Sequence, residues 1–324
     1  MPFYFPLPIT QPSERRFEGG DMPLYAGFDL GGTKLKFGLI DETGNVIDDS
    51  QADSPLKVQD LLQLIERIWT DLNVRHPRAI KAAGFGFPGV ISSKTQKIQQ
   101  SPNYQDLNDF DLVPALSRFL EVPFTVNNDA NMAAFGEYKR GAGRDAHSLV
   151  LLTIGTGLGT GLILEGKIWQ GVCGFGGELG HATVNRNGER CNCGSRGCLE
   201  TEVSGPKIAK NYFNIKKKDK TLDAQEICRR AQEGDKAACE AFAIAGRFLG
   251  IGLSIAINLL NPEKILLGGG VMEAGDLILK PAVEEAKQRS FEASFNCCRI
   301  EPASLGNRAG FIGSAFLAKE HIPS

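Results

Sequence analysis

Apolar and polar positions alternate in the first ordered part of the chain and then change to helical spacing. Two apolar runs flank a glycine turn, and in the second run Leu35, Phe37 and Leu39 face one way, which predicts an antiparallel strand hairpin. Further on, apolar residues recur three and four positions apart, which predicts an amphipathic helix. The elements expected here are strands at 24–30, 35–41, 46–52 and 82–90 and a helix at 58–72.

The same order of elements recurs in the second part of the chain. A strand runs into a helix at Asp129, and a second pair of apolar runs flanks the glycines of IGTGLGTG. The repetition predicts a duplicated α/β unit arranged as two lobes. The segments expected to form it are a strand at 124–130, helices at 130–141, 224–232, 237–260 and 276–291, a hairpin at 148–169, a strand meeting glycines at 264–271, and a turn and terminal helix at 306–321.

Bulk composition narrows the class of protein. The chain has 324 residues, 42% of them hydrophobic, which fits a globular protein of two lobes. The formal net charge of -2 disfavours a dedicated nucleic-acid or membrane surface. No uninterrupted apolar run approaches the roughly 18 residues of a membrane span. We therefore expect no nucleic-acid partner and no membrane association.

The first 23 residues differ from the rest. Residues 1–23 carry five prolines and no basic n-region, which predicts a disordered or extended tail rather than a signal peptide. Met22 is an alternative start, because the ordered pattern begins directly after it. A cytoplasmic location is the expectation, and thiols stay reduced there. Disulfides are then the poorer interpretation of the eight cysteines, whereas metal ligands and core positions remain.

The first glycine turn has the features of a phosphate-binding site. Asp29 lies at a strand end, and Gly31 and Gly32 allow the backbone to approach an anion closely. Thr33 adds a hydroxyl donor. Asp29 can also hold Mg²⁺, directly or through water, because hard cations prefer oxygen ligands. The plain alternative is a glycine-rich hairpin turn without a ligand.

Two further glycine clusters weigh against that alternative. Thr156 and Gly157 belong to a second hairpin of the same kind, and Gly269 and Gly270 belong to a cluster before a helix. Neither the GxxxxGK[ST] loop nor the GxGxxG turn is present, because strands follow the hairpin glycines. Two facing hairpins and a separate glycine platform predict a nucleotide held between two lobes.

Five short motifs together resemble the ROK group of sugar kinases and sugar-responsive repressors. They are DLGGTK at 29–34, NDAN at 128–131, IGTGLGTG at 154–161, GGELGH at 176–181 and CNCGSRGCLE at 191–200. The resemblance covers roughly residues 24–320. It implies the two-lobe actin-like, ribonuclease H-like ATPase fold. It also implies ATP and Mg²⁺ as co-substrates and a hexose as phosphoryl acceptor.

The cysteines of the last motif are spaced C-x-C-x4-C, and tetrahedral zinc would need a fourth ligand beside them. Reduced surface thiols are the alternative interpretation. The resemblance places the zinc histidine at the GH position of GGELGH. The zinc ligands expected from it are His181, Cys191, Cys193 and Cys198, forming a closed structural site.

Two glutamates flank this expected zinc site. Glu178 lies three residues before His181, and Glu200 lies two after Cys198. A carboxylate pair can accept hydrogen bonds from vicinal sugar hydroxyls, and a zinc-bound histidine can offer its second nitrogen to the sugar. The resemblance implies that Glu178, His181 and Glu200 contact the hexose. For Glu178 alone, a solvated loop acid is the alternative.

Asp129 is the candidate general base. It follows a predicted strand and opens a helix, at a strand end where α/β proteins build sites. An N-cap is the plain alternative, and both roles can hold together. The resemblance favours catalysis, gives Asn128 a sugar hydroxyl and aligns Asn103 with a sugar-contacting asparagine. The loop before Asn103 lacks the glycine usual in the family.

The resemblance also assigns the nucleotide side of the site. The phosphate-side residues are Gly31, Gly32, Thr33, Thr156 and Gly157, with Gly269 and Gly270 beside the adenosine. Lys34 occupies the lysine-or-arginine position of the family, and its alternative is a solvated turn lysine. The expected domains are a tail at 1–23, a small lobe at 24–127 completed by the helix in 306–324, and a larger zinc-bearing lobe at 128–305.

These features predict ATP-dependent phosphorylation of a hexose at its 6-hydroxyl. Glucose is the first candidate, since GGELGH resembles the glucokinase form and the fructokinase branch tends to carry proline before the glutamate. N-acetylglucosamine, N-acetylmannosamine and fructose are the alternatives. A sugar-sensing regulator is disfavoured, because only 28 residues precede Asp29 and a helix-turn-helix domain needs more. A catalytically silent sugar-binding protein is the third possibility. The family implies a homodimer or homotetramer.

Overall fold

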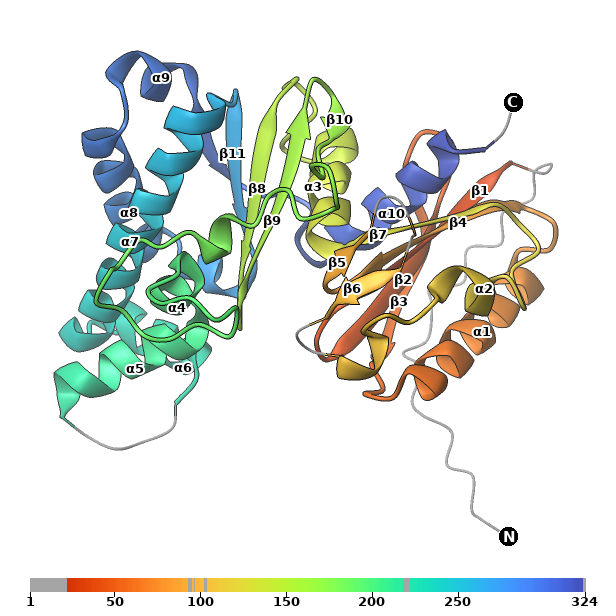
Figure 1. Cartoon of the computed structure of the whole chain (residues 1–324), viewed down its shortest axis with the longest axis horizontal. Helices are drawn as coiled ribbons and strands as arrows, with labels where there is room; N and C mark the ends of the chain where they lie inside the picture. Colours follow the sequence, from red (N-terminus) through yellow and green to blue (C-terminus); the bar gives the residue numbers. More distant parts are fainter. Residues whose placement is uncertain (1–21, 93–94, 96, 102–103, 218–221, 323–324) are drawn as a thin grey trace, which may run out of the picture.

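The computed structural model describes residues 22–92, 95, 97–101, 104–217 and 222–322. Asn103 and all but two residues of the predicted tail at 1–23 lie outside them. Figure 1 shows two lobes side by side, each built on a sheet flanked by helices. Two helices, α3 (Asp129–Arg140) and α10 (Ala309–Glu320), lie between the sheets.

The first sheet has the strand order β3-β2-β1-β4-β7. Its strands are β1 (Leu24–Leu30), β2 (Lys34–Ile40), β3 (Val46–Asp53), β4 (Ile80–Phe87) and β7 (Phe124–Asn128). Strand β1 pairs antiparallel with β2 and parallel with β4, and β4 pairs parallel with β7. Helix α1 (Val58–Arg75) packs one apolar face on this sheet, where the rings of Phe28 and Phe85 stack at 4.7 Å.

Shorter elements complete this lobe. They are β5 (Val90–Ile91), β6 (Ile98–Gln100), the 3-10 helix η1 (Gln105–Leu107) and α2 (Leu112–Leu116). Strands β5 and β6 form a two-stranded ladder of their own. None of these elements was among the sequence predictions, because each is too short to show a period.

The second sheet has the order β10-β9-β8-β11-β12. Its strands are β8 (Leu149–Ile154), β9 (Leu158–Leu164), β10 (Lys167–Ile168), β11 (Lys264–Gly268) and β12 (Arg299–Pro302). The 3-10 helices are η2 (Leu179–His181), η3 (Gly270–Ala274) and η4 (Gly306–Arg308). The remaining helices are α4 (Leu199–Val203), α5 (Gly205–Lys216), α6 (Ala224–Gln232), α7 (Lys236–Leu260), α8 (Asp276–Arg289) and α9 (Glu292–Cys297).

Helix α7 is the central helix of this lobe. Among the described residues it is the one helix long and apolar enough to cross a membrane, and 50% of its most apolar window is buried inside the protein. Its buried positions pack with α5, α8 and the sheet in one apolar cluster. The core helix of a globular lobe passes the same length and hydropathy test.

Helices α3 and α10 connect the lobes through very close packing. A Cβ atom on Gly136 would lie 2.1 Å from the Ala309 carbonyl oxygen, and one on Gly313 would lie 1.8 Å from that of Met132. Glycine is therefore required where the two backbones meet. The cluster around them joins Tyr25 of the first sheet to residues of the second, so a third apolar core lies between the sheets.

Most predicted elements are confirmed within a few residues. Both hairpins, the strand before Asp129 and the helices at 58–75, 224–232, 236–260, 276–289 and 309–320 are present. The buried strand expected within 82–90 covers 80–87: it begins two residues earlier than predicted, and it ends before Pro88 and Gly89, which were expected to stop it. Helices α4 and α5 were missed. Ser204 separates them in an extended conformation, and Pro206 is tolerated in the first turn of α5.

Candidate active site

Two carboxylates lie at the same edge of the first sheet. Strands β1, β4 and β7 run parallel, so their carboxyl ends meet there. Asp29 pairs in register with Gly86 of β4, and Gly86 pairs with Asn127 of β7. Asp129 follows β7 directly as the first residue of α3. The fold thus brings together two acids that are far apart in the sequence.

Hydrogen bonds hold Asp129 in place. Its Oδ1 accepts from the Ala130 amide at 2.9 Å and from Asn128 Nδ2 at 3.0 Å. Asn128 is the N-cap of α3, since its Oδ1 accepts from the Asn131 amide at 3.1 Å. The second N–H of Asn128 donates to the Gly89 carbonyl at 2.9 Å. The capping role therefore belongs to Asn128, which leaves Oδ2 of Asp129 for other partners.

The surroundings favour the protonated form of both acids. Burial raises the pKa of Asp129 to about 7, and the charges of Asp29 and Glu178 act in the same direction. Burial also raises the pKa of Asp29 to about 6, against an opposing effect of Lys36. Carboxyl groups that repel one another in this way form a site for a proton or a cation. A raised pKa near neutrality also suits a general base.

Activity is expected to depend on the protonation of Asp129. Because the pKa of Asp129 is raised to about 7, kcat/KM is predicted to fall about tenfold per pH unit below that value. The folded state binds this proton more tightly than the unfolded chain, so the stability it contributes is lost as pH rises from about 4 to about 7. A pH–rate profile of kcat/KM checks the prediction, and a profile flat between pH 5 and pH 8 would contradict it.

The two glycine hairpins face solvent at their tips. Gly32 and Thr33 are exposed between β1 and β2, and Thr156 is exposed between β8 and β9. A backbone hydrogen bond closes each turn. In the first, the Gly31 amide donates to the Lys34 carbonyl at 2.8 Å, and in the second, the Gly155 amide donates to the Gly157 carbonyl at 2.9 Å. Both tips present backbone and hydroxyl groups of the kind that bind phosphate oxygens.

The third glycine cluster borders a cavity. Gly269 has φ +89°, and a Cβ atom there would lie 2.3 Å from the Ile154 carbonyl oxygen, so glycine is required. Gly270 has open space at its Cβ position and lines a cavity of about 530 Å³. The first turn of α6 forms another side of this cavity. Its size falls within the usual range for small-molecule sites.

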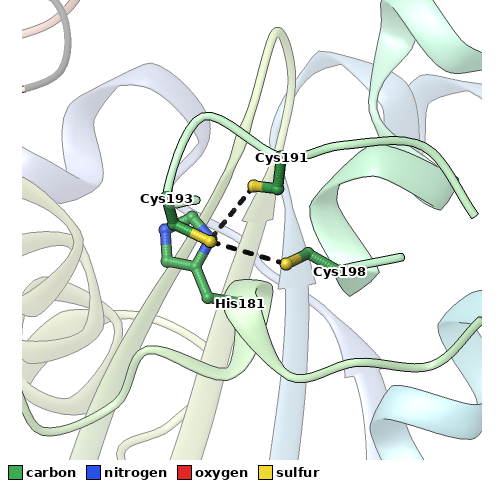
Figure 2. Close-up of side chains that lie close together, drawn as sticks. All are labelled: His181, Cys191, Cys193 and Cys198. Carbon is green, nitrogen blue, oxygen red and sulfur yellow. Dashed lines mark hydrogen bonds between the residues drawn. The ribbon is translucent and has the colours of Figure 1, made fainter. Parts of the chain in front are cut away.

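The predicted zinc ligands converge. Figure 2 shows His181, Cys191, Cys193 and Cys198 pointing toward one another, and their ligand atoms all lie within 4.8 Å of one another. The His181 Nδ1 to Cys191 Sγ distance is 3.6 Å, and so is the distance between the sulfurs of Cys193 and Cys198. Two Zn–S bonds of about 2.3 Å at the tetrahedral angle place sulfurs about 3.8 Å apart. The donor set therefore fits zinc.

The backbone prearranges this cluster. The Cys191 amide donates to the Ser195 carbonyl at 2.9 Å, and Gly194, with φ +93°, closes the turn between them. Burial raises the pKa of the Cys198 thiol to about 12, so a thiolate there requires a cation beside it. A metal ion held by these four residues would supply that charge.

The zinc cluster continues into the candidate sugar residues. His181 turns Nδ1 toward the cysteines and places Nε2 3.7 Å from Glu178 Oε2. Glu200 lies on the other side, with Oε1 4.0 Å from Cys191 Sγ and Oε2 accepting from the Leu158 amide at 2.9 Å. The cluster thus connects Glu178 to the second glycine hairpin.

Comparison with protein families agrees with this architecture. The ROK family profile matches residues 25–321. The chain belongs to the ROK family. A glucokinase of Halalkalibacterium halodurans is 35% identical over 316 residues, covering 91% of this chain and 95% of that relative.

Two further relatives are a repressor and a glucokinase of known structure. The xylose repressor of Bacillus subtilis is 31% identical over 301 residues, covering 91% of this chain and 77% of the repressor. The crystal structure of a ROK family glucokinase from Streptomyces griseus in complex with glucose and AMPPNP is 29% identical, with a TM-score of 0.77. The structural match covers 92% of this chain and 99% of the Streptomyces griseus glucokinase. The predicted two-lobe, actin-like fold is confirmed.

The sequence predictions missed three residues that support this site. Tyr104 is buried and donates to the Gly31 carbonyl at 3.0 Å, which fixes the first hairpin. Gln170 donates to Asn127 Oδ1 at 2.6 Å and thereby links the loop after β10 to β7. A Cβ atom on Gly310 would lie 2.3 Å from the Asp29 carboxyl carbon, so this glycine makes room for that acid. These contacts carry no local sequence signal.

Lys34, which the resemblance places on the phosphate side, has a partner on its own sheet. Its Nζ lies 2.6 Å from Asp53 Oδ1, its register partner on β3, and both side chains are exposed. Exposed pairs of this kind contribute about 0–1 kcal/mol. The phosphate role expected from the resemblance is untested, and the pair with Asp53 argues against it.

We expect Lys34→Met to change the KM for ATP less than about threefold and the unfolding free energy by less than about 1 kcal/mol. Steady-state kinetics and urea unfolding check this, with Asp53→Asn as the matched control that frees Lys34. A tenfold rise in the KM for ATP in Lys34→Met would instead place this lysine on the phosphates.

Proposed function

We propose that the chain is an ATP-dependent hexokinase that phosphorylates glucose at the 6-hydroxyl. One observation carries the proposal: Asp129 and Asp29 lie at the same edge of the first sheet. The pKa of Asp129 is raised by burial, by the charge of Asp29 and by the charge of Glu178 from the other lobe. A base, a cation-binding acid and a sugar-binding acid are the groups that such a reaction needs.

Asp129 acts as the general base. The 6-hydroxyl oxygen attacks the γ-phosphorus of ATP while its proton passes to the free Oδ2 of Asp129. The bond between the γ-phosphorus and the β,γ-bridging oxygen breaks, and ADP leaves with that electron pair. The N-cap geometry of α3 fixes the carboxylate before the sugar arrives.

The glycine clusters bind the nucleotide. The phosphates contact the two hairpin tips through Gly31, Gly32, Thr33, Thr156 and Gly157. The adenosine enters the cavity of about 530 Å³ beside Gly269 and Gly270. Mg²⁺ bound with ATP would supply positive charge to the phosphates, and Asp29 is the oxygen ligand placed to hold it.

Zinc is structural and shapes the sugar pocket. His181, Cys191, Cys193 and Cys198 form a closed set, so the metal has no position for substrate. Glu178 and His181 Nε2 contact the sugar hydroxyls, and Glu200 offers Oε1, since its Oε2 already accepts from Leu158.

Two asparagines complete the proposed sugar site. Both N–H groups of Asn128 are engaged, so it contacts the sugar through the remaining acceptor capacity of Oδ1. Asn103 lies outside the described residues, and its role stays a prediction. The cytoplasmic location, the lobe boundaries and assembly as a homodimer or homotetramer also stay predictions.

A sugar-sensing regulator is the second candidate, because xylose repressors and NagC of Escherichia coli are 30 to 34% identical to this chain. This chain covers 77% of the Bacillus subtilis repressor, whereas it covers 95% of the Halalkalibacterium halodurans glucokinase. A kinase turns the sugar over, and a regulator only binds it.

ADP release from Mg-ATP, measured with glucose, N-acetylglucosamine, N-acetylmannosamine, mannose and fructose in turn, separates the candidates. We expect glucose to give the highest kcat/KM. A higher kcat/KM for another sugar of the panel would replace glucose but retain the kinase. Sugar binding without ADP release from any of the five would favour the regulator.

A further inference from the structure

Glu137 is a buried acid with no place in the proposed chemistry. It lies on α3, eight residues after Asp129, or about 12 Å along the helix. Its side chain is completely buried, with 0% exposure. Burial of a charged group is costly unless hydrogen bonds compensate, so its partners indicate what it does.

Four donors surround the Glu137 carboxylate. Oε1 accepts from the amides of Ser304 and Leu305 at 2.9 and 2.7 Å. Oε2 accepts from the Ala142 amide at 2.9 Å and from the Ser304 hydroxyl at 3.1 Å. Each oxygen of the Glu137 carboxylate therefore accepts two hydrogen bonds, which compensates for its burial. A Cβ atom on Gly141 would lie 1.9 Å from Oε2, so the chain keeps glycine there to admit the carboxylate.

These partners lie where the chain passes between the lobes. Residues 141–148 lead from α3 to β8, and residues 303–308 lead from β12 back to α10. We call these two stretches the crossing segments. Rotation of one lobe against the other must change the backbone of the second crossing segment, because α10 packs on the first sheet, whereas α3 packs mainly on the second sheet. Glu137 bonds both crossing segments to the helix that begins with the candidate base.

A buried cation holds the first crossing segment from its other side. Lys264, only 4% exposed, begins β11 and places Nζ 2.6 Å from the Ala142 carbonyl oxygen. The same Nζ lies 2.5 Å from Asp145 and 3.1 Å from Glu301. The residue Ala142 is therefore fixed at its N–H by Glu137 and at its carbonyl by Lys264.

We propose that Glu137 is a positioning residue for phosphoryl transfer, which sets the axis of lobe closure by tying both crossing segments to α3. The inference rests on the kinase function proposed above. Closure must bring Asp129 and the sugar residues of the second lobe into register with ATP. A misplacement of about 1 Å at such a site can cost about a hundredfold in rate. The adenosine cavity next to Gly270 lies within the second lobe, so this part of nucleotide binding should not need the tie, and the loss should fall mainly on kcat.

The test is Glu137→Gln, because glutamine presents N–H groups to at least one pair of the four donors. We expect amide hydrogen exchange to become about tenfold faster or more at residue 142 or at residues 304 and 305, whichever face the amide nitrogen of the glutamine. We expect kcat to fall about ten- to a hundredfold, while the Kd for ATP changes less than about threefold. Ser304→Ala removes only the hydroxyl donor and should move exchange and kcat in the same direction by less.

Asp235→Asn is the matched control. Asp235 also accepts several hydrogen bonds, from the Ala237 amide at 2.9 Å and the Tyr212 hydroxyl at 3.0 Å, but lies within the second lobe at the start of α7. It should lower Tm without changing kcat at a temperature where the protein stays folded.

Three results would overturn the inference: unchanged exchange at residues 142, 304 and 305 in Glu137→Gln, an unchanged kcat despite faster exchange, or an equal fall in kcat in Asp235→Asn. If the unsubstituted enzyme turns over no sugar, the proposed function fails and the catalytic part of the inference fails with it. The exchange measurement still decides whether Glu137 holds the crossing segments, so the two failures are distinguishable.

Discussion

Replacing Asp129 by asparagine is expected to lower kcat for sugar phosphorylation by about 10²- to 10⁴-fold, the usual contribution of a positioned general base. Asparagine keeps Oδ1 as an acceptor for the Ala130 amide and Asn128, so α3 should start unchanged. It removes the oxygen that takes the proton. Steady-state ADP formation at saturating sugar and ATP measures the effect.

The same substitution has a second readout that does not depend on activity. Because the pKa of Asp129 is raised to about 7 in the folded protein, its charge destabilises the fold above that pH. Asparagine resembles the protonated form, so the variant should have a higher Tm than the unsubstituted protein at pH 8 and a similar one at pH 4. Asp106→Asn, an exposed acid on η1, is the control that should change neither Tm nor kcat.

A variant that retains more than about a tenth of kcat would show that Asp129 is not the base. A Tm at pH 8 below that of the unsubstituted protein would contradict the electrostatic account of the site.

Loss of the zinc cluster should have the second large effect. Cys198→Ser removes a completely buried ligand, and we expect stoichiometric zinc to be lost from the purified protein. Structural zinc contributes several kcal/mol or more, which corresponds to a fall in Tm of roughly 10 °C or more in a lobe of this size. Sugar affinity should fall as well, because the ring of His181 and the loop between Glu178 and Glu200 lose their anchor.

Cys297→Ser is the matched control, since Cys297 is an exposed free thiol outside the cluster. It should keep the metal, the Tm and the sugar affinity. Metal analysis by emission spectroscopy, thermal unfolding and calorimetric titration with glucose make the comparison. A Cys198→Ser protein with full sugar affinity would show that the cluster does not shape the pocket, even if it had bound zinc.

The sequence could predict those parts of the site that depend on residues close together in the chain. Glycines that open a turn, an acid that opens a helix and cysteines spaced for one metal ion each act over a few residues. The roles of Gly31, Asp129 and Cys191 could therefore be predicted from the residues next to them in the sequence. The structure places the ligand atoms of all four predicted zinc ligands within 4.8 Å of one another, as the spacing and the resemblance predicted.

Contacts over long stretches of chain could not be predicted in the same way. Glu137 accepts from Ser304, which is 167 residues away, and Tyr104 donates to Gly31, which is 73 residues away. Each of these side chains reads as an ordinary helix acid or core aromatic until the fold supplies its partner. Lys34 shows the converse, because its motif position suggests phosphate while β3 supplies Asp53.

The same limit applies within the proposed sugar site. The sequence placed Glu178 and Glu200 as a pair for sugar hydroxyls, but the fold commits one oxygen of Glu200 to the Leu158 amide in the second hairpin. A Cβ atom on Gly157 would lie 2.6 Å from that same oxygen. Glu200 is thus placed to connect the sugar side with the phosphate side, a coupling that spacing alone does not reveal.

The most direct measurement of the central claim is the identity of the product. The zinc-loaded protein would be incubated with Mg-ATP and glucose and the mixture followed by phosphorus NMR. The account predicts a new phosphomonoester coupled to the two protons of the sugar C6, appearing at the rate at which ADP forms. ADP and inorganic phosphate without a sugar phosphate, or bound glucose with no ATP consumed, would contradict it.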